Sequence, residues 1–205
     1  VYMCMADGPE YAEYLKKCSF ESVFLCHKRF LQVLELTGRP NRWLLKDPSH
    51  ISHTPELVST YPGAKFIHIH RNPVKSIGSL SSLTMSVRSG LSNHANAHKI
   101  GAAVLDFWQY AIEKSISDRA KHLTSEQIID IDYRDFIKNP LEQIKHIYQH
   151  FNFDLSQATL NEMQNFIYNQ SKDDHKPHLY DLKDFGLEEA KVQEAFSNYN
   201  RIHNF

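Results

Sequence analysis

An arginine, the start of a helix and a serine follow one another between Arg71 and Ser79. A guanidinium group offers phosphate a fork of hydrogen-bond donors, and the first turn of a helix adds exposed backbone N–H groups and a positive dipole end. Pro73 suits the first helical position, and Ser79 lies roughly two turns farther on, where its hydroxyl would complete the pocket. The segment therefore predicts an anion site, with a structural ion pair of Arg71 as the alternative.

A lysine and a histidine form a second candidate group in the stretch Lys46–His50. A lysine can neutralise charge on a group in transfer, and a histidine can take a proton from an attacking hydroxyl without a large pKa shift. Because the chain has 13 histidines, His50 stands out only through its neighbours. The alternative roles are a solvent-exposed Lys46 and a His50 that caps a helix or packs in the core.

Pairs of histidines offer a different chemistry, a metal site. His68 and His70 alternate along one predicted strand, and His94 and His98 have the i,i+4 spacing of one helix face. Neither pair has a cysteine or a carboxylate at a matching distance in the sequence. We therefore expect structural roles for these side chains and no bound metal.

Three apolar segments would position the candidate residues as strands: Arg42–Lys46, Ala64–Arg71 and Ile128–Tyr133. The segments between them have helical patterns. Strands that alternate with helices predict an α/β fold with a parallel sheet and helices on both faces. In such sheets ligands bind beyond the carboxyl ends of the strands, which places the chemistry just after Lys46 and Arg71.

The rest of the chain is mostly helical in pattern and shows no internal repeat, so we expect one domain over residues 1–205. Loops are predicted at Ser86–Asn93 and Ser171–Gly186, where polar residues and glycine accumulate. The expected helices are Glu10–Leu36, the end of a helix at Glu56–Tyr61, Val74–Leu83, a long helix that carries Ile100 to Ile112, one that starts at Pro140, one from Ser156 to Ile167, and Leu187–Tyr199.

The composition is that of a globular protein, with 41% hydrophobic and 23% charged residues and a net charge of −1. This charge balance argues against nucleic acid as a partner. No apolar run approaches the roughly 20 residues of a membrane span. The three cysteines fall within the first 26 residues without metal-binding spacing. They favour free thiols and a cytoplasmic location, although a segment lost from the N-terminus would be able to carry a signal or an anchor.

Four blocks of the sequence, taken in order, resemble one family of enzymes. The blocks are Arg42–His50, Tyr61–Phe66 with His70–Ser79, Ile129–Pro140, and Leu179–Leu187. They are similar to the LKxPxH and HRxPxxxxxS blocks, and to the later blocks, of bacterial-type sulfotransferases. Members of that family use 3′-phosphoadenosine 5′-phosphosulfate (PAPS) as the sulfuryl donor.

The resemblance implies a P-loop-NTPase-like fold of three layers, with a parallel sheet between helices. It implies transfer of a sulfuryl group from PAPS, as co-substrate and without a metal, to a hydroxyl or amine acceptor. The acceptor would be a small molecule, a glycan, a lipid or a peptide, with Met85–Lys99 as a candidate lining. The residue roles carried over are the 3′-phosphate site for Arg71 and Ser79, charge stabilisation for Lys46, the general base for His50, and closure over the nucleotide for Lys176, His178 and Tyr180.

The sequence departs from the family at its beginning. The family starts with a strand and a loop rich in glycine, arginine and serine, which cradles the 5′-phosphosulfate. Before Gly38 this chain has only Gly8. We therefore expect an N-terminally incomplete chain whose fold lacks the first strand and the phosphosulfate loop. A non-catalytic nucleotide-binding or interaction remnant is the alternative, whereas a nucleotide kinase is disfavoured because no GxxxxGK[ST] motif is present.

Overall fold

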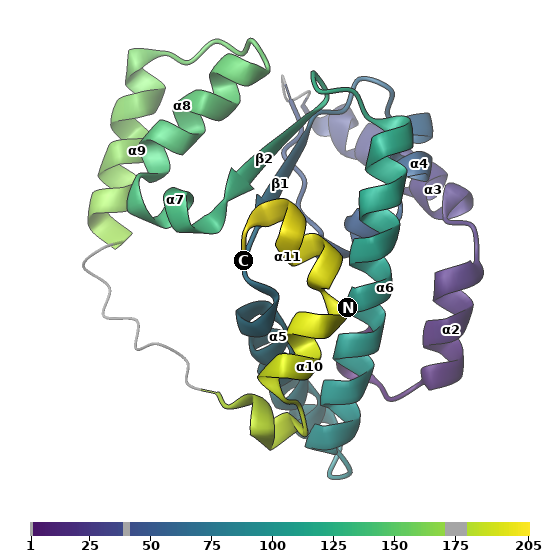
Figure 1. The fold of residues 1–205 in the computed structure, drawn as a ribbon. Coiled ribbons are helices and arrows are strands. Elements are labelled where there is room, and N and C mark those ends of the chain that lie inside the picture. Colours follow the sequence, from purple (N-terminus) through teal and green to yellow (C-terminus); the bar gives the residue numbers. More distant parts are fainter. Residues whose placement is uncertain (1, 39–41, 171–179) are drawn as a thin grey trace.

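A two-stranded parallel sheet forms the centre of the computed structural model, which describes residues 2–38, 42–170 and 180–205. Strand β1 (Phe66–His70) pairs with β2 (Ile128–Asp132) in a register that runs from Phe66 opposite Ile128 to His70 opposite Asp132. Two long helices, α5 (Pro73–Leu91) and α6 (Ala97–His122), connect the strands (Figure 1). The predicted parallel α/β arrangement and both of these strands are confirmed.

The third predicted strand, Arg42–Lys46, is wrong for the described residues. The segment has no regular secondary structure and pairs with no strand, and Leu44 is 88% exposed. Its apolar composition is typical of a buried strand, yet a strand also needs a neighbour for its backbone groups. Among the described residues β1 has such a neighbour on one edge only, the edge that faces β2.

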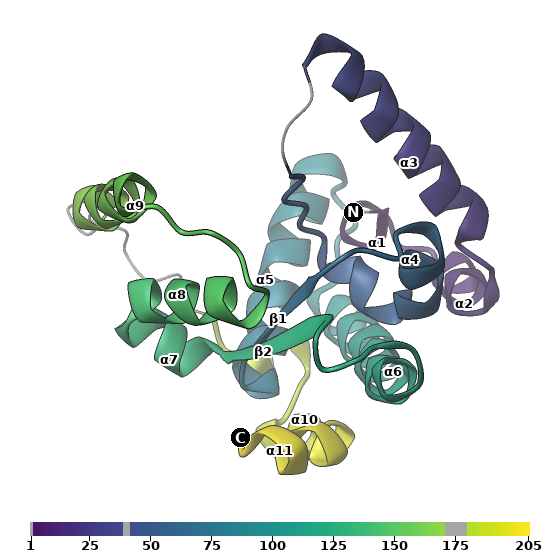
Figure 2. The same ribbon diagram turned by 90° about the horizontal axis from the view of Figure 1, so that it is seen from above.

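The N-terminal helical region is divided in two, which corrects the single predicted helix Glu10–Leu36. Cys18, the C-cap residue, has an extended conformation with φ −79° and ψ 150°, and the chain changes direction there. Figure 2 shows the helix that follows this change of direction, α3 (Glu21–Leu34), projecting from the body of the molecule. The elements of this region are α1 (Tyr2–Met5), α2 (Pro9–Lys17), α3 (Glu21–Leu34), the short 3₁₀ helices η1 (Glu35–Thr37) and η2 (Pro48–Ser52), and α4 (Thr54–Thr60).

Helix α5 extends eight residues beyond its predicted end at Leu83, so most of the loop expected at Ser86–Asn93 is helical. A buried stripe continues through Ile77, Ser81, Thr84 and Arg88 at helical spacing. The small polar side chains of this region suggested a loop because they compete with helical hydrogen bonds. Here packing against α6 decides the conformation.

Helices pack on both faces of the sheet, although Ile67 and Ile69 of β1 remain 42% and 47% exposed. On one face Ile129 and Ile131 of β2 pack against Ile147 and Phe151 at the end of α8. The other face meets α6 and the C-terminal helices (Figures 1 and 2). The remaining elements are α7 (Tyr133–Lys138), α8 (Pro140–His150), α9 (Gln157–Gln170), the 3₁₀ helix η3 (Leu182–Phe185), α10 (Glu189–Ala195) and α11 (Ser197–His203).

The main core joins α5 and α6 to the C-terminal segment. Its close packing is clearest at Gly101, where an added Cβ would lie 2.2 Å from the backbone oxygen of Phe185. The helix predicted at Leu187–Tyr199 is interrupted at Phe196, which turns inward between α10 and α11. The buried members of this core are Ile77, Ile100, Val104, Leu105, Phe185, Leu187, Val192, Phe196 and Tyr199.

Among the described residues, no helix combines the length and the apolar character that a membrane crossing demands. Cys4, Cys18 and Cys26 are free thiols, as expected.

Candidate functional site

The anion candidate Arg71 lies directly after β1, where the chain turns into α5 (Figure 1). Oδ1 of Asn72 accepts hydrogen bonds from the backbone N–H groups of Val74, at 2.9 Å, and Lys75, at 3.4 Å. Pro73 has no N–H group. The expectation of exposed backbone donors at this helix start is therefore wrong, because Asn72 already caps them. An anion here would depend on side chains.

The guanidinium group of Arg71 has hydrogen-bonding capacity left for a ligand. Its Cζ lies 4.9 Å from the ring centroid of Tyr133. Its Nε is buried and finds no hydrogen-bond acceptor in the described part of the chain. Within residues 2–38, 42–170 and 180–205 no carboxylate forms an ion pair with Arg71. A buried donor without a partner costs about 1–3 kcal/mol, a cost that an anion or a water molecule removes.

Tyr180 packs against the same helix that carries Ser79. Its hydroxyl donates a hydrogen bond of 2.8 Å to the backbone oxygen of Lys75. Its ring lies so close to Gly78 that an added Cβ would come within 2.4 Å of ring carbon Cε2. The structure thus brings Tyr180 against the first turns of α5, where Ser79 is half-buried. Two other predicted nucleotide residues, Lys176 and His178, lie outside the described residues.

Lys46 and His50 lie on either side of a helix start. Lys46 is exposed. Asp47 caps η2 through hydrogen bonds from the backbone N–H and hydroxyl of Ser49, at 2.7 and 2.6 Å. His50 is half-buried, with its ring edge-on to Phe24 at 5.6 Å between centroids. Burial lowers the pKa of His50, partly opposed by the charge of Asp47. A lowered pKa favours the neutral imidazole that a general base requires.

Next to Arg71, a polar network that is buried at His70 and Tyr199 and exposed at Asp130 connects β1, β2, α6 and α11. Asp130 accepts two hydrogen bonds from Arg119, at 2.8 and 2.6 Å, and one from Nε2 of His70 at 2.7 Å. Nδ1 of His70 lies 2.9 Å from the hydroxyl of Tyr199. Although burial pushes the pKa of Asp130 upwards, the hydrogen bonds from His70 and Arg119 outweigh it and hold that pKa well below its usual value.

The same network contains the group of described residues that is best placed for a metal. Possible ligand atoms of His68, His70 and Asp130 lie within 4.8 Å of one another. The sequence showed no carboxylate near the two histidines, whereas strand pairing places Asp130 directly opposite His68. However, Asp130 already binds His70 and Arg119, and a metal would have to compete with these contacts.

Comparison with known proteins adds to this geometry. The sequence model of the sulfotransferase family matches residues 3–157, which is more than half of the chain. The chain belongs to the sulfotransferase family.

Solved structures of other sulfotransferases have the same fold. The crystal structure of sulfotransferase STF1 from Mycobacterium tuberculosis H37Rv matches 96% of this chain with a TM-score of 0.84 and 32% sequence identity. Sulfotransferase STF9 from Mycobacterium avium matches 95% with a TM-score of 0.82 and 26% identity. The expected P-loop-like α/β fold is therefore confirmed. This chain covers 50% of each of those two chains.

A curated relative is omega-hydroxy-beta-dihydromenaquinone-9 sulfotransferase Stf3 from Mycobacterium tuberculosis (strain CDC 1551 / Oshkosh). It is 23% identical over 164 residues, which are 75% of this chain and 39% of the relative. The corresponding protein of Mycobacterium bovis gives the same values. The chain thus spans well under half the length of these two relatives.

The structure of this sulfotransferase-family chain also reveals a histidine–carboxylate pair that the sequence did not indicate. His53 stacks on Phe20 with 3.8 Å between ring centroids, and its Nδ1 lies 3.8 Å from Oε1 of Glu56. Nδ1 of His53 and Oε2 of Glu56 are both buried, and neither has a hydrogen-bond partner in the described ranges. The available signal was the spacing of three residues between His53, which caps α4, and Glu56 in the first turn of that helix.

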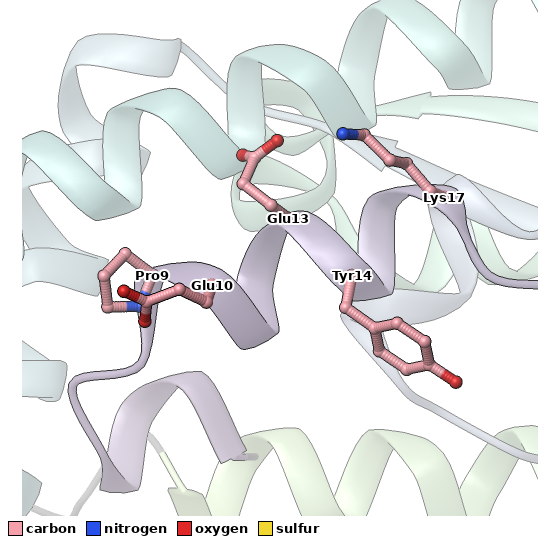
Figure 3. A pocket seen from close by; sticks show the side chains of 5 residues that line it. All are labelled: Pro9, Glu10, Glu13, Tyr14 and Lys17. Atoms are coloured by element: carbon pink, nitrogen blue, oxygen red, sulfur yellow. The ribbon is translucent and has the colours of Figure 1, made fainter.

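Two surface hollows of this sulfotransferase-family chain, both lined partly by residues of α2, include none of these residues. One is lined by residues of α2, and Figure 3 shows Tyr14 and Glu13 pointing to different sides of that helix. Trp108 packs against the main core, and the Tyr110 hydroxyl donates to the backbone oxygen of Lys16 at 2.6 Å. Packing therefore accounts for both aromatic side chains.

Proposed function

We propose that this chain forms part of an enzyme that transfers a sulfuryl group from PAPS to a hydroxyl or amine, with Arg71 and Ser79 binding the 3′-phosphate of the donor. The observation that supports this most is the buried Nε of Arg71, which lacks a partner among the described residues. Family membership supplies the reaction class, and the position just past the end of β1 matches the usual ligand edge of a parallel sheet.

The 3′-phosphate would bind mainly through side chains. Because Asn72 occupies the backbone donors of the first turn, Arg71 supplies the charge-assisted hydrogen bonds and Ser79 a hydroxyl. The helix dipole of α5 still favours an anion at this end. Tyr180, held against Lys75 and Gly78, would close the site from the C-terminal segment, together with the predicted Lys176 and His178.

In the proposed transfer, the acceptor oxygen or nitrogen attacks the sulfur atom in line with the bond to the 5′-phosphate oxygen. The new bond forms as that sulfur–oxygen bond breaks, and 3′-phosphoadenosine 5′-phosphate (PAP) leaves. Lys46 stabilises the charge on the departing oxygen, and His50 takes the proton of the acceptor. Most of the rate would come from positioning and charge stabilisation, as in phosphoryl transfer.

For the acceptor, we propose a chemical class and not an individual compound. One relative is named for omega-hydroxy-beta-dihydromenaquinone-9. Because this chain resembles that relative, we propose a hydroxylated small molecule, which includes lipids, as its acceptor in preference to a glycan or a peptide. A non-catalytic nucleotide-binding chain is the second candidate, because the contacts of Arg71 and Tyr180 bear on nucleotide binding alone. It predicts nucleotide binding without transfer of sulfate.

Calorimetric titration with PAP tests the proposal. We expect wild-type protein to bind PAP and Arg71→Ala to lose about 2–4 kcal/mol of binding free energy, because two charge-assisted hydrogen bonds are removed. Arg29→Ala is the matched control, since this exposed arginine lies on α3, the helix that projects from the body of the molecule. Folded wild-type protein that fails to bind PAP, or an Arg71→Ala variant that binds it normally, would contradict the proposal.

A further inference from the structure

Strand pairing brings two histidines and a carboxylate together on one face of the sheet. His68 and His70 are separated by one residue on β1, so their side chains project to the same face. In the parallel pairing with β2, His68 lies opposite Asp130. One possible ligand atom from each of these three side chains lies within 4.8 Å of the other two. The carboxylate that the histidine pair lacks in the sequence is therefore supplied by the neighbouring strand.

The contacts of His70 show which of its ring nitrogens faces this group. Nε2 lies 2.7 Å from Oδ1 of Asp130, and Nδ1 lies 2.9 Å from the hydroxyl of Tyr199. A histidine that binds a metal usually has its other ring nitrogen held by a hydrogen bond, which orients the ring. Tyr199, which is 4% exposed, is in place to hold Nδ1 while Nε2 binds a metal.

A metal ion here would take the place of the proton between His70 and Asp130. Zinc bonds of about 2.0–2.2 Å in a tetrahedral site put neighbouring ligand atoms about 3.3 Å apart, so the contact of 2.7 Å would open slightly. Arg119 competes for the same carboxylate through hydrogen bonds of 2.8 and 2.6 Å. The side chain of Asp130 is 43% exposed, however, and ion pairs open to solvent contribute little to stability. The arginine is thus a competitor that a metal can displace.

The burial of the three side chains suits a metal site with one open position. His70 is buried and His68 is half-buried, whereas the exposed Asp130 leaves the ion a path from solvent. Two histidines and one carboxylate form the ligand set of zinc sites that keep a fourth position for water. Calcium and magnesium prefer oxygen ligands throughout, so the two imidazoles favour zinc.

The other histidines considered are poorer ligands. His203 on α11 stacks on His70 with 3.7 Å between ring centroids and 20° between planes, and rings so nearly parallel do not converge on one ion. His94 lies in a turn before α6, which begins at Ala97, so His94 and His98 do not share a helix face. In the part of the chain that the structure describes, none of these three belongs to a group of three possible ligands.

We propose that His68, His70 and Asp130 bind one zinc ion between β1 and β2, with the fourth coordination position open to water. The ion takes no part in the sulfuryl transfer proposed above. It joins the two strands to each other and, through the hydrogen bond of His70 to Tyr199, to the C-terminal helix α11. Because the ligands come together only in the folded chain, zinc stabilises the fold by mass action.

Titration of the full chain with zinc tests this site. Protein freed of metal by a chelator and dialysed is titrated with zinc chloride in a calorimeter, and we expect one ion per chain. His68→Asn and Asp130→Asn should each weaken zinc binding more than about a hundredfold, because loss of a ligand exceeds the usual 10- to 100-fold effect of losing a residue that orients one. His94→Asn is the matched control and should bind zinc like the wild-type protein, since His94 is exposed and outside the group.

Two further variants test the arrangement around the ion. Tyr199→Phe removes the hydroxyl that orients His70 and should weaken zinc binding about 10- to 100-fold. Arg119→Gln removes the competitor for Asp130 and should tighten zinc binding. Urea unfolding of each variant without metal shows that it is folded, and added zinc should raise the unfolding midpoint of the wild-type protein but not that of Asp130→Asn.

The outcomes that would overturn the inference are equally specific. Folded wild-type protein that binds no zinc would do so, as would wild-type zinc affinity in both His68→Asn and Asp130→Asn. Loss of zinc in His94→Asn with retention in Asp130→Asn would place the ion at another site. No nucleotide enters these measurements, so their result does not depend on the proposed function.

Discussion

Tyr180 packs directly against Gly78, although about one hundred residues separate them. A Cβ at position 78 would lie 2.4 Å from the tyrosine ring, whereas one at Gly90 on the same helix would meet nothing within 4 Å. The absence of a side chain at Gly78 is therefore what allows the C-terminal segment to close on α5. This contact makes the predicted nucleotide role of Tyr180 open to a direct test.

We predict that Gly78→Ala moves Tyr180 away from α5 and weakens PAP binding severalfold. The same change should lower the free energy of unfolding by about 1–3 kcal/mol, as overpacking does. Gly90→Ala is the control, and it should stabilise the helix slightly, by up to about 1 kcal/mol, with PAP affinity unchanged. Calorimetry and urea unfolding measure the two effects. Equal behaviour of both variants would mean that the ring of Tyr180 is not held by Gly78.

The second prediction is a loss of stability in acid. Burial lowers the pKa of His68 to about 3 and that of His203 to about 4, from an ordinary value of 6.5. At a pH between these lowered pKa values and 6.5, the two histidines are protonated in the unfolded chain but neutral in the folded one. The free energy of unfolding therefore falls as the pH drops below about 6.5, with a slope of about 1.4 kcal/mol per pH unit for each full proton. His203 contributes less than a full proton because it is more exposed and solvent screens it.

Urea unfolding between pH 5 and pH 8 measures this slope. His68→Asn should make the dependence below pH 6.5 shallower and leave the curve above pH 7 parallel to that of the wild-type protein. An equally steep slope in the variant would show that other groups cause the acid sensitivity.

The third prediction separates the two histidines near Lys46 as candidate bases. His50→Asn should lower the transfer rate about 10²- to 10⁴-fold, the usual contribution of a general base, while PAP affinity is kept. Because burial lowers the pKa of His50, kcat/KM of the wild-type enzyme should hold at pH 6.5 and decline only in more acidic solution. The measurement is transfer of labelled sulfate to an acceptor.

His53→Asn is the comparison for that experiment. His53 is buried between Phe20 and Glu56, so its replacement should lower stability with a smaller effect on the transfer rate. Loss of transfer in His53→Asn with retention in His50→Asn would assign the base to the His53–Glu56 pair instead.

Hydrophobic patterns within single segments of the sequence were enough to predict a long helix and two of the strands. Helix α6 has an apolar stripe that starts at Ile100, and β1 and β2 are rich in β-branched residues, so each was recognised. The segment Arg42–Lys46 has the same signal but no strand to pair with among the described residues, and pairing is a property of the fold rather than of the segment.

The sequence also allowed only some residues of the candidate site to be selected. Arg71 and His50 could be chosen from motifs because each lies next to a turn with a clear signature, and Ser79 because of its helical spacing from Arg71. Asp130 and Tyr199 could not, because their partnership with His70 depends on strand register and on the packing of α11, which bring together residues 60 and 129 positions apart. The prediction of exposed backbone donors after Arg71 was wrong for a local reason, because the side chain of Asn72 caps these N–H groups.

That cap provides the last prediction. Asn72→Ala removes the acceptor of the Val74 and Lys75 N–H groups and should cost about 1 kcal/mol of stability, as the loss of an N-cap usually does. The freed N–H groups would then be available to the proposed phosphate. The loss in PAP binding free energy should therefore be smaller than the loss in unfolding free energy, or PAP affinity should rise instead of falling in proportion. Asn96→Ala is the control, because Asn96 caps α6 through the Lys99 N–H at 3.0 Å and should cost a similar amount of stability with no change in PAP affinity. Thermal unfolding with and without PAP compares them, and a PAP affinity in Asn72→Ala that drops as far as in Arg71→Ala would show that the capping amide itself binds the ligand.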